Sequence, residues 1–363
     1  MLCRPYFTEL FLTRSLARPR LLFGVLSSDR HVEWLFFSSP QPQNPYEKSS
    51  LVVASKFHVK ISRDFCRYMC RCSYASSLLY FQGMQISKDD DDTVPMICNP
   101  ITGQYAILPK LSRHKQRKSI LGYDPINKQF KVLFMAYPYC DDYHKILTLG
   151  TGNMRWRNIE CPLTHDIFNW CEGICINGIL YYLGRPTDES SYDKGPFVIV
   201  CFDVRSEKFK IVDTKFCWLS SDLILINYKG KLGRINLKYA SNGGFPLELC
   251  MWILEDVEKH EWSKYVYSLW DDSKIVKVDC NFSVVGMTAT GEIVLSIDRT
   301  SKPYYVFYFS PKSNSLQSVE IKGFGEYLEK LKISGRVFAF VDHVEDLNVN
   351  NIKQLNSGQL RPK

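Results

Sequence analysis

Long apolar runs, an ordered cysteine framework and clustered charge are all missing from this 363-residue sequence. No apolar run approaches the roughly 18 residues that a membrane-spanning helix needs, so we expect no membrane partner. The thirteen Cys residues are odd in number and lack the spacing of a secreted disulfide scaffold, which favours a reducing compartment, cytoplasmic or nuclear. The net charge of +8 is spread along the chain, and without a basic stripe we expect no nucleic-acid partner.

Recognisable catalytic motifs are also missing. Four histidines stand apart in the sequence, with no Ser or Cys elbow motif beside any of them: His144, His165, His260 and His343. The sequence therefore assembles no nucleophile, base and orienting acid. We expect no catalytic residue, no cofactor and a non-enzymatic protein.

Three segments match part of a metal- or phosphate-binding motif, and each lacks residues that the motif requires. Cys66, Cys70 and Cys72 are spaced by four and two residues without a second pair nearby, whereas a zinc site usually draws on two pairs, so core packing in a strand is favoured. The acidic run Asp89–Asp92 lacks the Gly and distal Glu of a calcium loop. Gly150-Thr-Gly152 lacks the Gly-Lys-Ser/Thr of a phosphate loop and is typical of a hairpin turn. We expect no metal site.

What the sequence does contain is a series of short strands. Aromatic residues make up 14% of the chain and favour strands. The stretch Gly173–Ile211 holds two hairpins joined by a polar loop. Its Asn177-Gly178 dipeptide suits a two-residue turn in which both central residues have positive φ. Four strands in about 40 residues form one small sheet that needs neighbours to bury its faces.

Copies of this unit recur along the chain. The first hairpin turn falls near Ser76, Asn127, Asn177, Lys229 and Thr290. The second falls near Thr102, Gly152, Arg205, Val257 and Ser313. Both series keep a period of about 50 residues, near that of kelch-type propeller blades. The outermost strand of each unit begins with a large apolar residue, which we expect to fill the gap to the next blade: Tyr105, Trp156, Phe209, Trp262 and Leu316.

The two ends of the chain supply a further unit. Leu21–Leu26, Val32–Ser38 and Leu51–Val59 are strand-like, and Gly335–Val341 adds a fourth strand from the other end. Closure by both ends removes exposed sheet edges. We predict an all-β, kelch-like β-propeller of six four-stranded blades over residues 21–345, followed by a flexible tail over 346–363. Five blades with a separate N-terminal piece are the alternative.

Binding is expected in the loops that join the second and third strands of each unit, because these loops vary while the strands repeat and because a propeller displays them on one face. Tyr and Arg are common interface anchors. The candidate partner-binding residues in or beside these loops are Tyr137, Tyr139, Tyr143, Arg185, Tyr192, Tyr239 and Arg299.

Several ordered segments resemble a known family. They include Ile97–Pro109, Leu121–Leu133, Gly173–Leu183, Cys201–Phe209 and Trp252–Ser263. Together they are similar to the plant F-box-associated domain in its type-3 form, over roughly Arg20 to His343. The resemblance implies a kelch-like propeller that recruits substrate proteins, in a family whose F-box binds the Skp-type adaptor of a cullin-based ubiquitin ligase.

The first 20 residues resemble the segment that follows an F-box, and we expect the F-box itself to be missing. They are Arg-rich with one acid, which also allows a transit peptide, and Phe7 and Leu10 allow a short helix. The expected function is substrate recognition by an unidentified protein partner, with adaptor and cullin as partners only if an F-box is supplied. The alternatives are a hydrolase that uses the central pore and a truncated product that competes for substrates.

Overall fold

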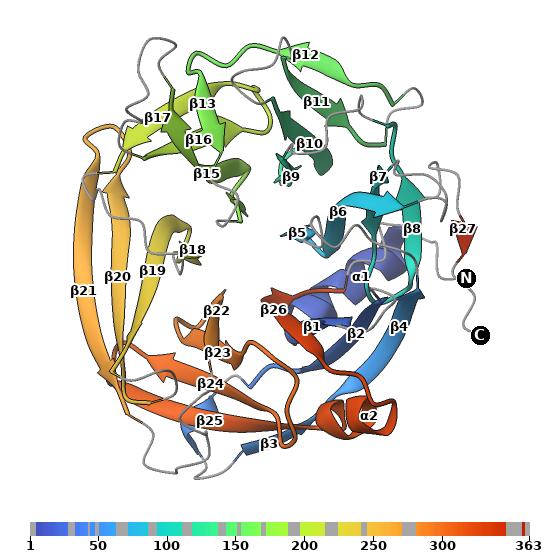
Figure 1. The fold of residues 1–363 in the computed structure, drawn as a ribbon, viewed down its shortest axis with the longest axis vertical. Helices are drawn as coiled ribbons and strands as arrows, with labels where there is room; N and C mark the ends of the chain where they lie inside the picture. The colour runs from blue at the N-terminus through green and yellow to red at the C-terminus, as the bar shows by residue number, and fades with distance from the viewer. Residues whose placement is uncertain are drawn as a thin grey trace.

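A computed structural model shows six β-sheets arranged as blades around a central axis (Figure 1). It describes residues 5–27, 33–42, 44–47, 51–62, 72–85, 93–110, 118–136, 143–150, 154–167, 172–187, 197–214, 224–240, 245–270, 281–345 and 358–359. The all-β, six-bladed propeller predicted from the repeat is therefore confirmed. Within the described residues, no helix is long and apolar enough to cross a membrane.

Five blades follow one another along the chain, and each runs from an inner to an outer strand. Blade 1 contains β5 (Cys72–Ala75), β6 (Leu78–Gln85), β7 (Thr93–Cys98) and β8 (Gln104–Ile107). Blade 2 contains β9 (Lys118–Asp124), β10 (Gln129–Met135), β11 (His144–Thr148) and β12 (Arg157–Ile159). Blade 3 contains β13 (His165–Ile167), β14 (Ile174–Ile176), β15 (Ile179–Pro186), β16 (Val198–Asp203) and β17 (Phe209–Asp213).

The remaining two follow the same plan. Blade 4 contains β18 (Ile224–Tyr228), β19 (Lys231–Tyr239), β20 (Leu247–Asp256) and β21 (Glu261–Leu269). Blade 5 contains β22 (Phe282–Met287), β23 (Ile293–Ile297), β24 (Tyr305–Ser310) and β25 (Ser315–Lys322). The inner strand of blade 3 is divided, since β13 and β14 both pair with β15.

Blade 6 is closed by strands from both ends of the chain. Its order is β26-β1-β2-β4, with β1 (Arg20–Ser27), β2 (Glu33–Pro40), β4 (Lys56–Ser62) and β26 (Gly335–His343). The C-terminal strand β26 is the innermost, with Gly24 opposite Phe338. The expected combination of three N-terminal strands and one C-terminal strand is confirmed.

The stretch Leu51–Val59 departs from the prediction of one strand. It divides at Ser55 into β3 (Leu51–Ala54) and β4. The reason is that Ser55 turns toward blade 5, where its backbone N–H and its hydroxyl both donate to the carbonyl of Lys322, at 2.8 and 3.0 Å. Strand β3 then pairs in parallel with β25, so it fastens blade 6 to blade 5.

Helices play a minor part. Helix α1 (Pro5–Leu16) precedes the propeller, η1 (Pro45–Glu47) lies between β2 and β3, and α2 (Phe324–Lys330) connects blades 5 and 6. Helix α2 was not predicted, although Glu326 in its first turn accepts a 2.8 Å hydrogen bond from the backbone N–H of Gly323, whose φ is 83°. Phe324 packs against Tyr304 with ring centroids 4.6 Å apart. Of the predicted flexible tail, the structure describes only β27 (Gly358–Gln359), paired with β8, and the expected flexibility stays a prediction.

The predicted hairpin turns have the expected backbone. Asn177 and Gly178 have φ angles of 49° and 86°, as a two-residue turn of this type requires. Five longer turns share a different design. In each, a polar side chain accepts hydrogen bonds from backbone N–H groups, and the residue four positions later has a positive φ. The pairs are Asn99 and Gly103, Asp124 and Lys128, Asp203 and Glu207, Asp256 and His260, and Ser310 and Asn314.

The hydrophobic core consists of layers between neighbouring blades. For example, Leu78 and Tyr80 of blade 1 pack with Leu121 and Val132 of blade 2. The bulky first residues of the outer strands all belong to such layers or pack against them, as expected: Tyr105, Trp156, Phe209, Trp262 and Leu316. Cys72 is buried in one of these layers, as expected for core packing. Cys66, Cys70 and Asp89–Asp92 lie outside the described residues.

Candidate partner-binding face

Each blade has two distinct ends. At the turn end of blades 1 to 5, the first strand connects to the second and the third to the fourth, whereas in blade 6 the first strand, β26, and the second, β1, come from opposite ends of the chain. At the loop end, the second strand passes to the third and the outer strand crosses to the next blade. Strand register assigns residues to these ends. In blade 4, for example, Leu269 at the end of β21 lies opposite Leu247 at the start of β20, so Trp270 is at the loop end.

Of the seven candidate binding residues, four are described and all four lie at the loop ends of different blades. Tyr143 precedes β11 and is 62% exposed. Arg299 is exposed and its backbone bridges to Arg336. Tyr137, Tyr139 and Tyr192 lie outside the described residues.

Arg185 and Tyr239 are more closely tied to the scaffold. The guanidinium of Arg185 lies 5.0 Å from the ring centroid of Phe197. The hydroxyl of Tyr239 accepts a hydrogen bond from the backbone N–H of Phe282 at 2.8 Å, and the two rings are stacked. Both side chains therefore pack within the chain, where each links the end of one strand to the start of another at the loop end.

Two exposed apolar residues at the loop end were not predicted. Trp270, directly after β21, is 65% exposed, and Leu331, directly after α2, is 45% exposed. Trp and Tyr are enriched among the residues that contribute most binding energy at protein interfaces. The sequence carries a signal for Trp270, because it ends the apolar strand Glu261–Leu269 and is followed by the acidic pair Asp271-Asp272.

The turn end is occupied by contacts between blades. Arg205, in a turn of blade 3, donates to both carboxylate oxygens of Asp124 in blade 2, at 3.1 and 3.2 Å. These hydrogen bonds lower the pKa of Asp124 to about 2. Glu207 in the same turn receives Lys131 Nζ at 2.6 Å and also pairs with Arg157. Burial opposes the charge of Glu207, but the two cations outweigh it and lower its pKa.

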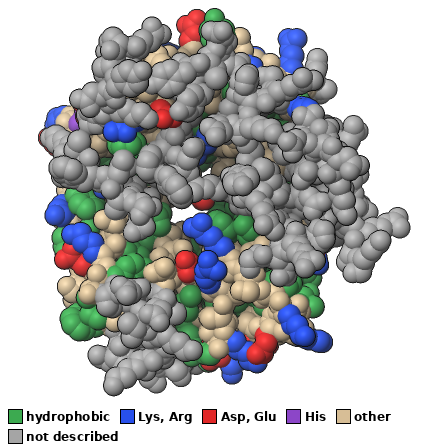
Figure 2. Space-filling view, viewed as in Figure 1, with side chains coloured by type: hydrophobic (Ala, Val, Ile, Leu, Met, Phe, Trp, Pro, Cys, Tyr) green, Lys and Arg blue, Asp and Glu red, His purple; other side chains and the backbone are tan. Residues whose placement is uncertain are grey.

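The central channel was the site required by the hydrolase alternative. It encloses about 370 Å³ and is lined by inner strands of five blades, β5, β14, β18, β22 and β26. Among the residues that the structure describes, the charged ones in its wall are Glu172, Arg336 and Asp342, and Figure 2 shows basic side chains beside the central opening. Asp342 accepts a 2.6 Å hydrogen bond from Gln41 Nε2, and burial raises its pKa. Among the described residues, no potential metal-binding group lies at the axis.

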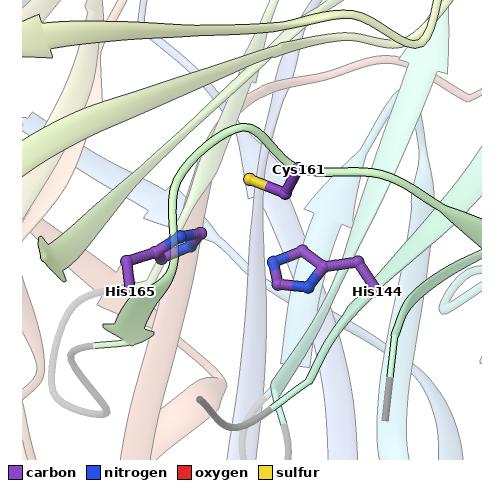
Figure 3. A group of neighbouring side chains, drawn as sticks. All are labelled: His144, Cys161 and His165. Carbon is purple, nitrogen blue, oxygen red and sulfur yellow. The ribbon is translucent and has the colours of Figure 1, made fainter. Parts of the chain in front are cut away.

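The histidines do not all stand apart in space. The rings of His144 and His165 lie 5.4 Å apart, with Cys161 beside them (Figure 3). They come from the start of β11, the start of β13 and the connection between blades 2 and 3, so a sequence separation of 21 residues hides the contact. Burial raises the pKa of the Cys161 thiol, which is the opposite of an activated nucleophile. This cluster also lies at the loop end.

Comparison with known proteins identifies the family to which the chain belongs. Residues 20–344 match the family described as F-box associated beta propeller domain. F-box protein At3g57590 of Arabidopsis thaliana is 53% identical, and the match covers 97% of this chain and 85% of that protein. Putative F-box protein At5g42430 of the same plant is 54% identical over 96% of this chain and 84% of its own length. Putative F-box protein At1g30925, also from Arabidopsis, is 55% identical over 96% of this chain, which spans 60% of that relative.

A likeness to solved structures is weaker. The crystal structure of puromycin hydrolase matches with a TM-score of 0.41 and 8% identity, over 68% of this chain and 38% of that chain, and no functional conclusion rests on it. The family match and the propeller agree with each other over nearly the whole chain. The chain therefore belongs to the F-box associated beta propeller domain family.

Proposed function

We propose that this propeller is a protein-recognition module that captures a partner protein at its loop end. The observation that carries the proposal is the exposure of two large aromatic side chains, Tyr143 and Trp270, at the loop ends of blades 2 and 4. The membership in a family whose relatives are named F-box proteins supports a protein-interaction role.

The capture site would combine aromatic anchors with arginine. Tyr and Trp contribute large apolar area at low entropic cost, and Arg contributes hydrogen bonds to an acidic or carbonyl-rich partner surface. Arg299 and Arg336 lie close together at the loop end of blades 5 and 6, where β26 begins. A partner with an apolar patch bordered by acidic groups fits this arrangement.

Proximity labelling in plant cells tests the proposal. We expect the wild-type chain to enrich a small set of proteins, and the double variant Tyr143→Ala/Trp270→Ala to lose them. The matched control is Ile126→Ala, because Ile126 is 70% exposed at the turn end of blade 2. Loss of the same proteins with Ile126→Ala, or retention with the double variant, would contradict a loop-end site.

We propose further that the captured protein is a substrate of a cullin-based ubiquitin ligase. The names of the relatives support this, since F-box proteins are the family in which an F-box binds a Skp-type adaptor. The propeller would then supply recognition and the F-box the connection. Co-purification of residues 1–363 with a Skp-type adaptor tests the division of labour. Robust direct binding would contradict the dependence on an F-box, whereas partner capture without adaptor would support action as a substrate competitor.

A further inference from the structure

We propose that His144, Cys161 and His165 bind a single zinc ion at the loop end between blades 2 and 3. One potential ligand atom from each residue lies within 4.8 Å of the other two. Figure 3 shows the side chains of His144 and Cys161 turned toward the ring of His165. The site is independent of the proposed partner-binding role, because the argument for it rests on the three side chains and their surroundings.

The first argument is an unpartnered buried nitrogen. Nε2 of His144 is buried and has no hydrogen-bond partner among the described residues. Buried polar side-chain atoms are nearly always satisfied, and an exception needs an explanation such as an ion. A metal ion bound to Nε2 would satisfy its lone pair.

The second argument is the orientation of His165. Its Nδ1 lies 2.8 Å from the carbonyl oxygen of Leu163, and only a protonated Nδ1 donates to a carbonyl. The lone pair is therefore on Nε2. Zinc-binding histidines typically donate one ring N–H to a carbonyl or carboxylate in this way, which fixes the ring for ligation through the other nitrogen. Nε2 of His165 now faces the hydroxyl of Tyr182 at 3.2 Å, a contact that zinc would replace.

The surroundings also hold the ring of His165 in place, since it packs against the ring of Tyr182 with centroids 5.6 Å apart. Gly184 provides room for the His165 ring, because a Cβ at Gly184 would lie 2.8 Å from Cδ2 of His165.

The donor set selects the metal. Two imidazole nitrogens and one thiolate suit zinc, with Zn–N near 2.0–2.1 Å and Zn–S near 2.3 Å. Tetrahedral ligands at those bond lengths are roughly 3.3–3.7 Å apart, so the three side chains must close by about 1 Å. Cys161 lies in an irregular connection and is only partly buried, so the closure would fall mainly on this connection. Its proton leaves on binding, since a coordinating thiol is deprotonated. The fourth position is open to water.

Metal analysis and cobalt spectroscopy test the site. We expect the purified full chain to retain about one zinc per molecule. After chelation, cobalt(II) chloride should produce a thiolate-to-cobalt absorption band, and zinc chloride should raise the thermal midpoint by several degrees. Cys161→Ser and His144→Gln should abolish the band and reduce the retained zinc at least tenfold, while both variants still unfold cooperatively.

Two matched controls locate the site within the chain. Cys201→Ser replaces a buried cysteine in β16 of blade 3, and His260→Gln replaces a histidine that pairs with Asp213. Both should keep zinc and the cobalt band. A chain with negligible zinc and no cobalt band would overturn the proposal. A band that persists in Cys161→Ser would also overturn it, because the ion would then be held by other cysteines.

Discussion

The two ends of the propeller are built from the same strands but use their side chains differently. At the turn end of blades 2 and 3, Asp124 and Glu207 are enclosed by cations from the neighbouring blade. At the loop end, Tyr143 and Trp270 are exposed, and two histidines and a cysteine meet without an internal partner for Nε2 of His144. Among the described residues, these two turn-end carboxylates are paired within the chain, whereas the loop end presents two exposed aromatic side chains and a buried imidazole nitrogen without a partner.

The same repeat thus contributes to stability at one end of the propeller and, in our proposal, to binding at the other. The turn design recurs in five places, with an acceptor side chain and a left-handed residue four positions later, so these positions are constrained by backbone geometry. Loop-end residues are constrained by no such rule. We therefore expect substitutions of the paired polar residues at the turn end to change stability, and substitutions of exposed aromatic residues at the loop end to change binding.

The largest loss of stability is expected from removing β26, the strand that closes the ring of blades. A chain truncated after Ser334 lacks β26, whose buried Val337 belongs to the core between blades. It leaves β1 with an open edge, so we expect loss of the cooperative unfolding transition and aggregation. A chain truncated after Glu345 is the control. Circular dichroism melts of the two should differ completely; a shared melting curve would show that closure is dispensable.

We expect the folding stability to depend strongly on pH because of the turn end of blade 6, where His58 and His343 lie near Arg20. Burial and then Lys56 and Arg20 lower the pKa of His58 to about 4, and burial, His58 and Arg20 lower that of His343 to about 3. The folded chain thus binds fewer protons than the unfolded chain, so stability is full above about pH 6.5 and falls toward pH 4.

Each of these histidines contributes up to about 1.4 kcal/mol per pH unit in that window. The neighbouring Asp342 has a raised pKa and partly offsets the loss, because it gains a proton on folding as pH falls. Urea unfolding at intervals between pH 7 and 4.5 measures the slope. Replacing His58 with Gln should flatten it, whereas an unchanged slope would remove His58 from the account.

A smaller loss of stability is expected from Asp124→Ala. The carboxylate of Asp124 accepts hydrogen bonds from Arg205, the backbone of Ile126 and the side chain of Asn127. Losing them should reduce the free energy of unfolding by about 1–3 kcal/mol. Asp124→Asn keeps an acceptor for Ile126 and should cost less. Denaturant titration measures both, and equal losses would show that a neutral amide acceptor contributes nothing at this turn.

The smallest change in stability is expected at the loop end. Trp270→Ala and Tyr143→Ala should each alter the free energy of unfolding by less than about 0.5 kcal/mol, because both side chains are exposed. Each should weaken partner binding about tenfold or more, as loss of an aromatic anchor does. Ile126→Ala should change neither quantity. Isothermal titration with the identified partner provides the affinities, and a large loss of stability in either loop-end variant would show a structural role instead.

The sequence predicted the parts of the molecule that depend on local chemistry. Asn177-Gly178 was recognised because only certain residues tolerate positive φ, and the interblade role of Trp156 followed from its recurrence at the start of an outer strand. The division at Ser55 could not be predicted, since it depends on the carbonyl of Lys322, 267 residues away. Likewise, the approach of His144 to His165 depends on how the connection between blades 2 and 3 folds. The binding role of Arg185, Tyr239 and Arg299 stays a prediction.

Hydrogen–deuterium exchange of the propeller with and without its partner tests the contrast between the two ends most directly. We predict that bound partner slows exchange in the loop-end segments, around Tyr143, Trp270 and Leu331. Exchange at the turns that contain Asn177 and Glu207 should stay unchanged. Protection concentrated at those turns, with none at the loop end, would contradict the account.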